Sequence, residues 1–425
     1  RWGFFPSVSL GWRPTEESFM EFYKEKIGDL KLRASYGILG SQAIGTYDRF
    51  TVYDVYDNSY AYNNKTVSGA GFKLGLENLT WEKTQTFNIG VDASFLQNSL
   101  TVTFDYFHKR TNDILMKPLI SSVFGTEMPM ANIGKMQNQG WDLSVNYRLK
   151  TGAFTHNFNF NLGDSWNKVL EFPGDEQITQ VEELSRIIRV GVPLNSYYGY
   201  KMAGFFQSYD EIEASAIPVG AKVQPGDIKF VDRNDDGIID SKDKFILGNA
   251  FPRYTFGFTY GLNWKGIDFS MFWQGVGKRD MMLRGELIEP YHANYSYTIY
   301  KHQLDFWTPT NTEARWPRLA APGSDSNRNN YGNGNGSDLF LLDGKYLRLK
   351  NLTIGYTLPK EWTKHLGMQK ARLYINGQNL LTFSNNSFID PESSEFDSKM
   401  STSGANSGRS YPTLRYFGFG VDIEF

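Results

Sequence analysis

The feature that most constrains this chain is an alternation of apolar and polar residues with a period of two. In residues 254–264 every even-numbered position is aromatic or leucine, and every odd-numbered position is threonine, glycine or asparagine. Similar patterns recur at 86–95, 100–106, 141–149, 158–162 and 351–356. This period predicts β-strands with one apolar and one polar face. Small and amide-bearing polar partners favour a wet barrel interior, although a soluble sandwich with one solvated face would alternate in the same way.

The lengths of the connections separate the barrel from the sandwich. About eleven strands are expected, near residues 4–12, 29–39, 81–96, 99–112, 136–149, 153–164, 253–264, 266–276, 345–357, 371–383 and 412–425. Short turns and two helical linkers, at 14–27 and 359–369, alternate along the chain with long connections. Short turns at one rim and long loops at the other are typical of outer-membrane β-barrels. We therefore predict an all-β fold that crosses the membrane with antiparallel strands.

The expected domain organisation is one unit, residues 1–425, forming the C-terminal half of a barrel of about 22 strands. Its long extracellular loops are expected near 39–80, 113–135, 165–252, 277–344 and 384–411. The last strand ends on the aromatic residue Phe425, as bacterial outer-membrane strands do, and the even-numbered residues of 254–264 should face lipid. With Phe425 on the periplasmic side, an odd strand count places Arg1 at the extracellular rim. The other half of the barrel and a plug domain are then expected outside this chain.

Composition excludes several other functions. The net charge of −2 gives no electrostatic reason to expect nucleic acid as a partner. Because the chain has no cysteine, it cannot form a disulfide scaffold or a thiolate site. Its five histidines are scattered singly, and no nucleophile-elbow, phosphate-loop or zinc-protease motif occurs. The chain is therefore not expected to be an enzyme.

Residues 232–243, with the sequence DRNDDGIIDSKD, match the spacing of a calcium-binding loop. Glycine at position 6 would permit the sharp turn, and oxygen ligands would come from positions 1, 3, 5, 7, 9 and 12. The candidate metal ligands are the side chains of Asp232, Asn234, Asp236, Asp240 and Asp243, with the carbonyl of Ile238. The alternative is a polar turn closed by its own side-chain hydrogen bonds. No other cofactor is expected.

Two of the long loops are rich in aromatic residues. Flat aromatic faces stack on sugar rings and peptide side chains, so these residues are candidates for substrate contact. The candidates are Tyr197, Tyr198, Tyr291, Tyr295, Tyr297 and Trp307. The alternative is packing within the loops over the barrel mouth. In the same region, residues 327–336 are rich in glycine and asparagine and are predicted to be a mobile loop tip.

Six short stretches, spread along the chain in a fixed order, resemble the SusC-like TonB-dependent transporters of Bacteroidota. They are LKLRASYG at 30–37, NLTWEK at 78–83, NQGW at 138–141, GDIKFVD at 226–232, YLRLKN at 346–351 and NGQNL at 376–380. The resemblance implies import of oligosaccharides or peptides across the outer membrane of a Gram-negative bacterium. It also implies a SusD-like surface lipoprotein as a lid, outer-membrane lipid as surroundings, and TonB contacted through the missing N-terminal part.

Two other functions compete with this one. A secreted all-β protein that binds or degrades carbohydrate would be soluble without detergent and would not need the alternating loop lengths. A passive porin would need neither a plug nor TonB. Sugar and peptide importers would share every feature described above, so the substrate stays open between these two classes.

Overall fold

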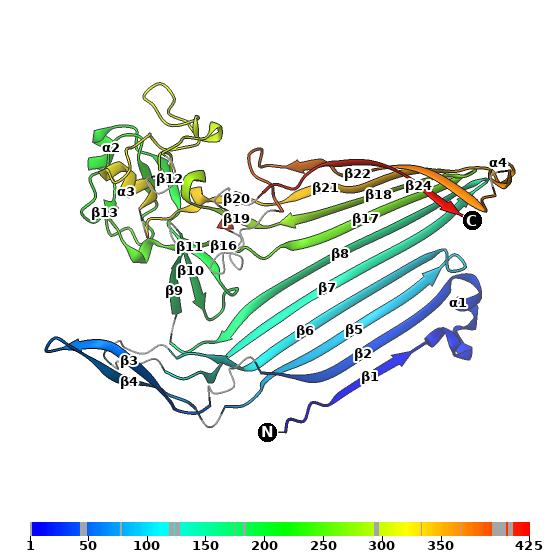
Figure 1. Cartoon of the computed structure of the whole chain (residues 1–425), viewed down its shortest axis with the longest axis horizontal. Coiled ribbons are helices and arrows are strands. Elements are labelled where there is room, and N and C mark those ends of the chain that lie inside the picture. Colours follow the sequence, from blue (N-terminus) through cyan, green and yellow to red (C-terminus); the bar gives the residue numbers. More distant parts are fainter. Residues whose placement is uncertain are drawn as a thin grey trace.

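The computed structural model describes residues 2–42, 49–76, 79–118, 123, 128–174, 176–181, 184–292, 297–332, 334–365, 367–392, 405–406 and 411–425. Its largest element is an antiparallel sheet of eleven strands (Figure 1). In spatial order, which is also chain order, these are β1 (Ser7–Trp12), β2 (Gly28–Ser41), β5 (Glu82–Phe95), β6 (Leu100–Met116), β7 (Ala131–Thr151), β8 (Phe154–Glu171), β17 (Arg253–Trp264), β18 (Ile267–Lys278), β21 (Tyr346–Thr357), β22 (Lys370–Ser384) and β24 (Tyr416–Glu424). The eleven predicted strands are thus confirmed. Within the described residues β1 and β24 are the two open edges of the sheet.

Short and long connections lie at opposite ends of the sheet, as the sequence predicts. The predicted helical linkers contain η1 (Pro14–Glu16), η2 (Ser18–Met20) and α1 (Glu21–Lys26) between β1 and β2, and α4 (Lys360–Lys364) between β21 and β22. Figure 1 shows α1, α4 and the C-terminal end at one rim, with the N-terminal end and the long loops at the other. Three strands, β6, β7 and β8, extend further toward the long-loop rim than predicted, because their pairing continues where the alternation of apolar residues stops.

One face of the sheet is an apolar belt. Directly paired residues on five neighbouring strands form one of its rows, namely Leu32, Val91, Phe104, Leu143 and Leu162. Side chains of this face remain exposed in the chain alone, for example Ile89 at 47%, Ile375 at 57% and Phe419 at 81%. The even-numbered residues of β17 lie on the same face, as predicted. A water-soluble sandwich would bury such a face, so its exposure argues for a lipid-facing wall.

The height of the belt approaches the roughly 25 Å that outer-membrane barrels present to lipid. From Trp141 to Leu149 the strand β7 rises roughly 27 Å, which a tilt of about 40° reduces to about 21 Å along the membrane normal. At the short-turn rim the belt ends in aromatic rings: Phe154 and Trp264 stack with centroids 5.2 Å apart, and Phe158 and Tyr260 lie 5.0 Å apart. Amphipathic rings at this level are typical of the membrane interface.

Two long loops fold together into a separate unit, here called the loop body, which comprises the described residues of 176–252 and 279–345. It contains α2 (Tyr209–Glu213), α3 (Asp325–Tyr331), η4 (Ser241–Asp243), η5 (Gly285–Leu287), η6 (Lys301–Gln303) and η7 (Asp338–Phe340). Its short strands are β9 (Glu176–Val181), β10 (Leu184–Arg189), β11 (Ser196–Gly199), β12 (Met202–Phe205), β13 (Ile217–Pro218), β14 (Ile228–Phe230), β15 (Ile238–Ile239), β16 (Phe245–Gly248), β19 (Asp280–Leu283) and β20 (Leu341–Asp343). In Figure 1 the loop body stands beyond the long-loop ends of β17 and β18.

Two further elements belong to other long connections. A hairpin of β3 (Val52–Tyr62) and β4 (Lys65–Lys73) projects from the long-loop rim between β2 and β5 (Figure 1). Strand β23 (Ala405–Asn406), from the connection between β22 and β24, pairs in parallel with β19 of the loop body. Within the described ranges, each helix is too short or too polar to cross a bilayer.

Candidate functional site

The face of the sheet opposite the apolar belt is polar and carries ion pairs that cross from strand to strand. Arg33 on β2 contacts Asp92 with its Nε at 2.8 Å and Asp105 on β6 with its Nη1 at 2.8 Å. It reaches Asp105 across Gly90 on β5, where an added Cβ would lie 2.3 Å from a carboxylate oxygen of Asp105. A glycine is therefore required at that position for the guanidinium to span the intervening strand.

The same arrangement recurs near the short-turn rim. Arg372 on β22 donates to both carboxylate oxygens of Asp268 on β18, at 2.8 and 2.7 Å, and contacts Asp422 on β24 at 2.9 Å. It crosses Gly355 on β21, where an added Cβ would meet the guanidinium at 2.7 Å. Bidentate pairs of this kind fix the geometry of both partners. The polar face is thus a wall of ordered charges and not a passive surface.

Between these ion pairs the polar face is hollowed. One hollow of about 1020 Å³ is lined by Ser9, Arg33, Asn88, Lys109 and Asp142, among others. A second, of about 510 Å³, is lined by hydroxyls and amides that include Thr103, Ser144, Asn161 and Gln274, together with apolar residues such as Phe272 and Val276. Groups of this kind can donate and accept hydrogen bonds along a water-filled passage. This is the interior expected of a barrel that admits polar solutes.

Near the long-loop rim, Arg348 on β21 anchors the connection that follows β22. Its side chain is only 4% exposed, and it contacts Asp390 at 2.6 Å, Glu392, and Thr382 Oγ1 at 2.9 Å. Tyr346 donates its hydroxyl proton to the same Glu392 at 2.9 Å. Although burial alone raises the pKa of Asp390, the hydrogen bond from Arg348 lowers that pKa below its ordinary value. The loop after β22 is therefore tied to the polar wall by a buried cluster of charges.

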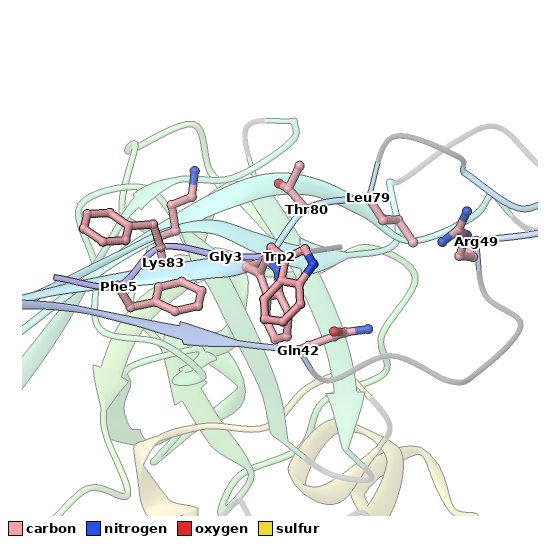
Figure 2. Close-up of a pocket in the computed structure, with 10 residues that line it drawn as sticks. Trp2, Gly3, Phe5, Gln42, Arg49, Leu79, Thr80 and Lys83 are labelled. Carbon is pink, nitrogen blue, oxygen red and sulfur yellow. The ribbon is translucent and has the colours of Figure 1, made fainter.

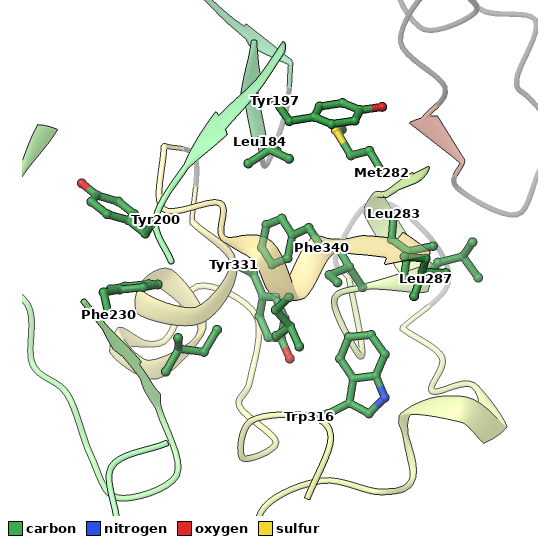
Figure 3. Close-up of a cluster of buried hydrophobic side chains, with 14 of the residues drawn as sticks. Leu184, Tyr197, Tyr200, Phe230, Met282, Leu283, Leu287, Trp316, Tyr331 and Phe340 are labelled. Carbon is green, nitrogen blue, oxygen red and sulfur yellow. The ribbon is translucent and has the colours of Figure 1, made fainter. Parts of the chain in front are cut away.

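The loop body has the hydrophobic core that the sheet lacks (Figure 3). Leu184 and Tyr197 from the first loop and Met282, Trp316 and Phe340 from the second have no exposed surface. Their contacts join residues more than a hundred positions apart. The two loops therefore form one packed unit at the rim.

A buried carboxylate locks the two loops together. Asp227, with no exposed surface, accepts hydrogen bonds from Ser326 Oγ at 2.9 Å and Asn330 Nδ2 at 3.1 Å. Asn330 also accepts from the backbone N–H of Ile228 at 2.8 Å. Burial raises the pKa of Asp227 despite these donors. Asp227 belongs to one of the six family-like stretches, yet the sequence alone gave no sign of its partner in the other loop.

These hydrogen bonds of Asp227 with Ser326 and Asn330, here called the staple, also correct the prediction of a mobile loop tip. Residues 327–336 were predicted to be a mobile loop tip, but Asn327, Asn329, Asn330 and Tyr331 are all buried. Their segment forms α3, whose asparagines make hydrogen bonds inside the loop body. The asparagines of this segment are therefore buried hydrogen-bonding residues and do not indicate a mobile loop.

The six aromatic candidates for substrate contact fall into different places. Tyr197 has no exposed surface, and Tyr198 and Trp307 are 6% and 7% exposed, so all three are packed inside the loop body. Substrate contact would require them to leave this core, and we therefore assign them the packing role. Tyr291 is partly buried, Tyr297 is 61% exposed, and Tyr295 lies outside the described residues. Neighbouring Tyr300, an aromatic of the same loop, is 37% exposed.

The predicted calcium loop closes on itself. Asp232 accepts from the N–H of Gly237 at 2.9 Å, Asp236 accepts from Ile238 at 3.1 Å, and Asp240 accepts from Lys242 at 2.7 Å. Among the described residues, no group of three or more acidic, histidine or cysteine side chains is close enough to hold a metal ion. These contacts fit the polar-turn alternative. One oxygen, Oδ1 of Asp232, is buried without a hydrogen-bond partner and would suit a cation.

A smaller pocket of about 390 Å³ lies at the long-loop rim beside β1 (Figure 2). Trp2, Phe5 and Trp81 supply its aromatic surface, and Arg49 and Lys83 supply its charge. The rings of Phe5 and Trp81 meet edge to face with centroids 5.8 Å apart. An added Cβ at Gly40 would strike the Phe5 ring at 2.1 Å, so glycine permits this packing.

An antiparallel wall with a polar hollowed face, an apolar face and long loops at one rim defines half of a transmembrane β-barrel. Residues 1–380 match the family described as "TonB dependent receptor-like, beta-barrel". The chain belongs to this family of receptors, whose members are not enzymes. This membership supports the prediction that the chain is not an enzyme.

Individual relatives of the chain are also TonB-dependent receptors. Over its whole length the chain is 33% identical to TonB-dependent receptor P26 of Formosa agariphila and 30% identical to TonB-dependent receptor SusC of Bacteroides thetaiotaomicron. It covers 42% and 40% of those proteins, so it spans about two fifths of the length of the curated relatives it matches. The fold also matches the structure of the RagAB peptide importer in the open-open state, with a TM-score of 0.77 at 23% identity, covering 99% of this chain and 42% of that one.

Proposed function

We propose that this chain forms part of an outer-membrane importer of oligosaccharides or peptides in a Bacteroidota-type bacterium. The observation that carries the proposal is the hollowed polar wall, which ends at the loop body on one rim. Ordered ion pairs, hydroxyls and amides provide the contacts that polar solutes need inside a barrel. The apolar belt on the other face provides the surface that lipid needs.

Energy from TonB and a SusD-like surface lipoprotein complete the proposed importer. The longer relatives are named TonB-dependent receptors, and this chain covers 42% of the first of them. The contact with TonB is accordingly proposed to lie in the part that this chain does not cover. The loop body is proposed as the surface that meets the lipoprotein, because it is a packed unit at the rim where long loops gather.

Uptake by the full-length protein tests the proposal against the passive porin. Cells with and without TonB would be given labelled oligosaccharides and labelled peptides, and accumulation would be measured for each. The proposal expects uptake of one class that disappears without TonB. Equal uptake in both strains would support a passive pore.

The exposed aromatics of the loop body test the lipoprotein contact. Removing all of 291–307 would unfold the loop body, because Gln303 and Trp307 are buried in it. The sharper variant is Tyr297→Ala with Tyr300→Ala, which should weaken copurification of the lipoprotein and lower uptake, with barrel assembly intact by heat-modifiable migration. Tyr209→Ala is the matched control, since Tyr209 is 62% exposed but lies on α2 of the first long loop, whereas Tyr297 and Tyr300 belong to the second. Unchanged copurification in the double variant would remove these tyrosines from the contact.

We also propose that 232–243 binds Ca²⁺ through the side chains of Asp232, Asn234, Asp236, Asp240 and Asp243 and the carbonyl of Ile238. The support is the ligand spacing and the unpartnered buried oxygen of Asp232. Calcium should slow proteolysis of the loop body in the full-length protein, and Asp232→Asn should abolish this protection. Asp235→Asn is the control, because position 4 is not a ligand position. Protection that is identical with calcium and with a chelator would leave only the polar turn.

A further inference from the structure

The face of the sheet that carries the apolar belt, here called the outward face, changes from apolar to aromatic to cationic residues toward the long-loop rim. The row that contains Phe104 is wholly apolar. The next row toward the long-loop rim contains Tyr106, Trp141 and Asp164, whose carboxylate pairs with Arg253. The row after it contains Phe87, His108 and Gln139. Each step is two residues along the strand, which is about 7 Å. The face thus passes from hydrocarbon to an interfacial aromatic girdle.

One step further, the same face becomes cationic. Gln85, Arg110, Gln137 and Lys168 are direct pairing partners on β5, β6, β7 and β8, so they form one row across four strands. Arg110 and Lys168 are both exposed, and two strand spacings place them roughly 10 Å apart. The two amides stand beside them; Gln137 already donates one hydrogen bond to Gln139 at 2.9 Å, and its amide group has a second N–H.

The charges of this region do not cancel. Lys83 pairs with Asp113 at 3.8 Å, Lys135 with Glu171 at 2.6 Å, and Arg253 with Asp164. These three cations are paired, whereas in the part of the chain that the structure describes Arg110 and Lys168 have no carboxylate within ion-pair distance. Two uncompensated cations therefore remain directly above the aromatic girdle.

This stratification fits an amphiphile with acyl chains and anionic groups at fixed heights. We propose that the outward face of β5–β8 binds the phosphate groups of an outer-leaflet glycolipid of the lipid A type, held by Arg110 and Lys168 with Gln85 and Gln137. Its acyl chains lie on the Phe104 and Tyr106 rows. A free phosphate would need the cations but not the apolar rows beneath them, so the continuity of the two favours lipid. The inference rests on the proposed outer-membrane location.

The pocket in Figure 2 extends the same surface. Lys83 lies on the same face of β5 as Gln85, two residues closer to the long-loop rim. It lines the pocket together with Trp81 and Arg49. Aromatic rings stack on sugar rings, so this pocket suits the sugar part of a headgroup whose phosphates sit at Arg110 and Lys168.

Native mass spectrometry of the detergent-purified full-length protein provides the test. The protein would be titrated with bisphosphorylated lipid A, with the same lipid after removal of its phosphates, and with inorganic phosphate. Arg110→Glu with Lys168→Glu should lower occupancy by bisphosphorylated lipid A by about tenfold or more, since each cation near a lipid surface contributes appreciably. The milder Arg110→Gln with Lys168→Gln should give an intermediate loss if charge reversal prevents folding.

Lys109→Glu is the matched control, because Lys109 neighbours Arg110 in the chain but lines the hollow of the opposite face. This variant should retain wild-type binding of lipid A. Equal binding of the phosphate-free lipid, unchanged binding by both double variants, or competition by inorganic phosphate would overturn the proposal. The readout is lipid occupancy and not uptake, so a protein that binds lipid A without importing would contradict only the proposed function.

Discussion

The sheet and the loop body use hydrophobic side chains in opposite ways. On the sheet, large apolar residues such as Phe419 and Ile375 remain 81% and 57% exposed, and polar residues such as Ser144 and Asn161 line the hollowed side. In the loop body, Trp316 and Phe340 have no exposed surface, and buried polar residues such as Asp227 and Asn330 are hydrogen-bonded to each other. The difference follows from the solvent: hydrocarbon surrounds the belt of a barrel, whereas water surrounds a loop at its rim.

The comparison also separates two sources of stability. Backbone pairing along ten neighbouring strand pairs holds the sheet together, and in lipid every such backbone group must be satisfied. The loop body has only short strands and depends on burial of side chains. Substitutions that shrink a side chain should therefore damage the loop body more than the sheet.

The largest effect is expected from Phe340→Ala. Emptying this fully buried site should destabilise the loop body by about 3–5 kcal/mol. Hydrogen exchange of the full-length protein in detergent should show faster exchange in 184–252 and 297–345 and unchanged protection of β5–β8. The matched variant Ile354→Ala removes a belt residue that is 41% exposed and should leave the loop body unchanged. Equal effects of both variants on the loop body would break the comparison.

Placing a charge on each face of one strand in turn should distinguish the lipid-facing side of the sheet from the water-facing side. Val145 and Ser144 are neighbours on β7, the first in the apolar belt and the second on the wall of a hollow. Val145→Arg should cost about 2–4 kcal/mol of barrel stability, and Ser144→Arg much less, because only the first faces hydrocarbon. Folding into lipid vesicles across a urea series measures both. A larger cost for Ser144→Arg would reverse the assignment of the faces.

A smaller loss is expected from Asn330→Ala in the staple. The variant leaves Asp227 Oδ1 and the N–H of Ile228 without a partner, at a cost of about 1–3 kcal/mol. Limited proteolysis should then separate the two loops while the sheet stays intact. Asn335→Ala is the control, since Asn335 makes its hydrogen bond to Arg328 at an exposed site. Wild-type resistance to protease in Asn330→Ala would show that the staple is dispensable.

The smallest effect concerns pH. His302 stacks on Phe388 at 3.8 Å, meets Trp316 edge to face, and lies near Tyr300 and Arg315; burial lowers its pKa. A histidine with a depressed folded pKa contributes stability above its unfolded value of about 6.5, and that stability is lost as pH falls below it. Asp227 has a raised pKa, so its contribution to stability increases as pH falls, opposite to that of His302. The wild type must therefore be compared with His302→Gln, in which only the histidine is removed. Proteolysis of the loop body between pH 8 and 5 should accelerate less in His302→Gln than in the wild type; parallel profiles would exclude His302.

The sheet could be predicted from the sequence because its information is local. The alternation at 254–264 specifies both a strand and its faces without knowledge of any other segment. The ends of β6, β7 and β8 were missed, since there the strands continue by pairing with neighbours and not by alternation.

The loop body could not be predicted in this way because its information is nonlocal. Tyr197 and Tyr297 are both tyrosines in aromatic loops, yet one has no exposed surface and the other is 61% exposed. What buries Tyr197 is a core that includes Met282 from the other loop. Likewise Asn330 suggested a mobile tip until its partner Asp227, 103 residues away, was known.

A cysteine scan tests the central claim that one face meets lipid and the other water. The chain contains no cysteine, so a single cysteine introduced at any position from 141 to 149 is the one thiol that residues 1–425 offer to the label. In the full-length protein in lipid vesicles, a fluorophore at Trp141, Leu143, Val145, Tyr147 and Leu149 should be quenched by brominated lipid. Cysteines at Asp142, Ser144, Asn146 and Arg148 should instead react with a water-soluble maleimide. The account predicts strict alternation between the two readouts, and the same readout at neighbouring positions, or the reversed pattern, would contradict it.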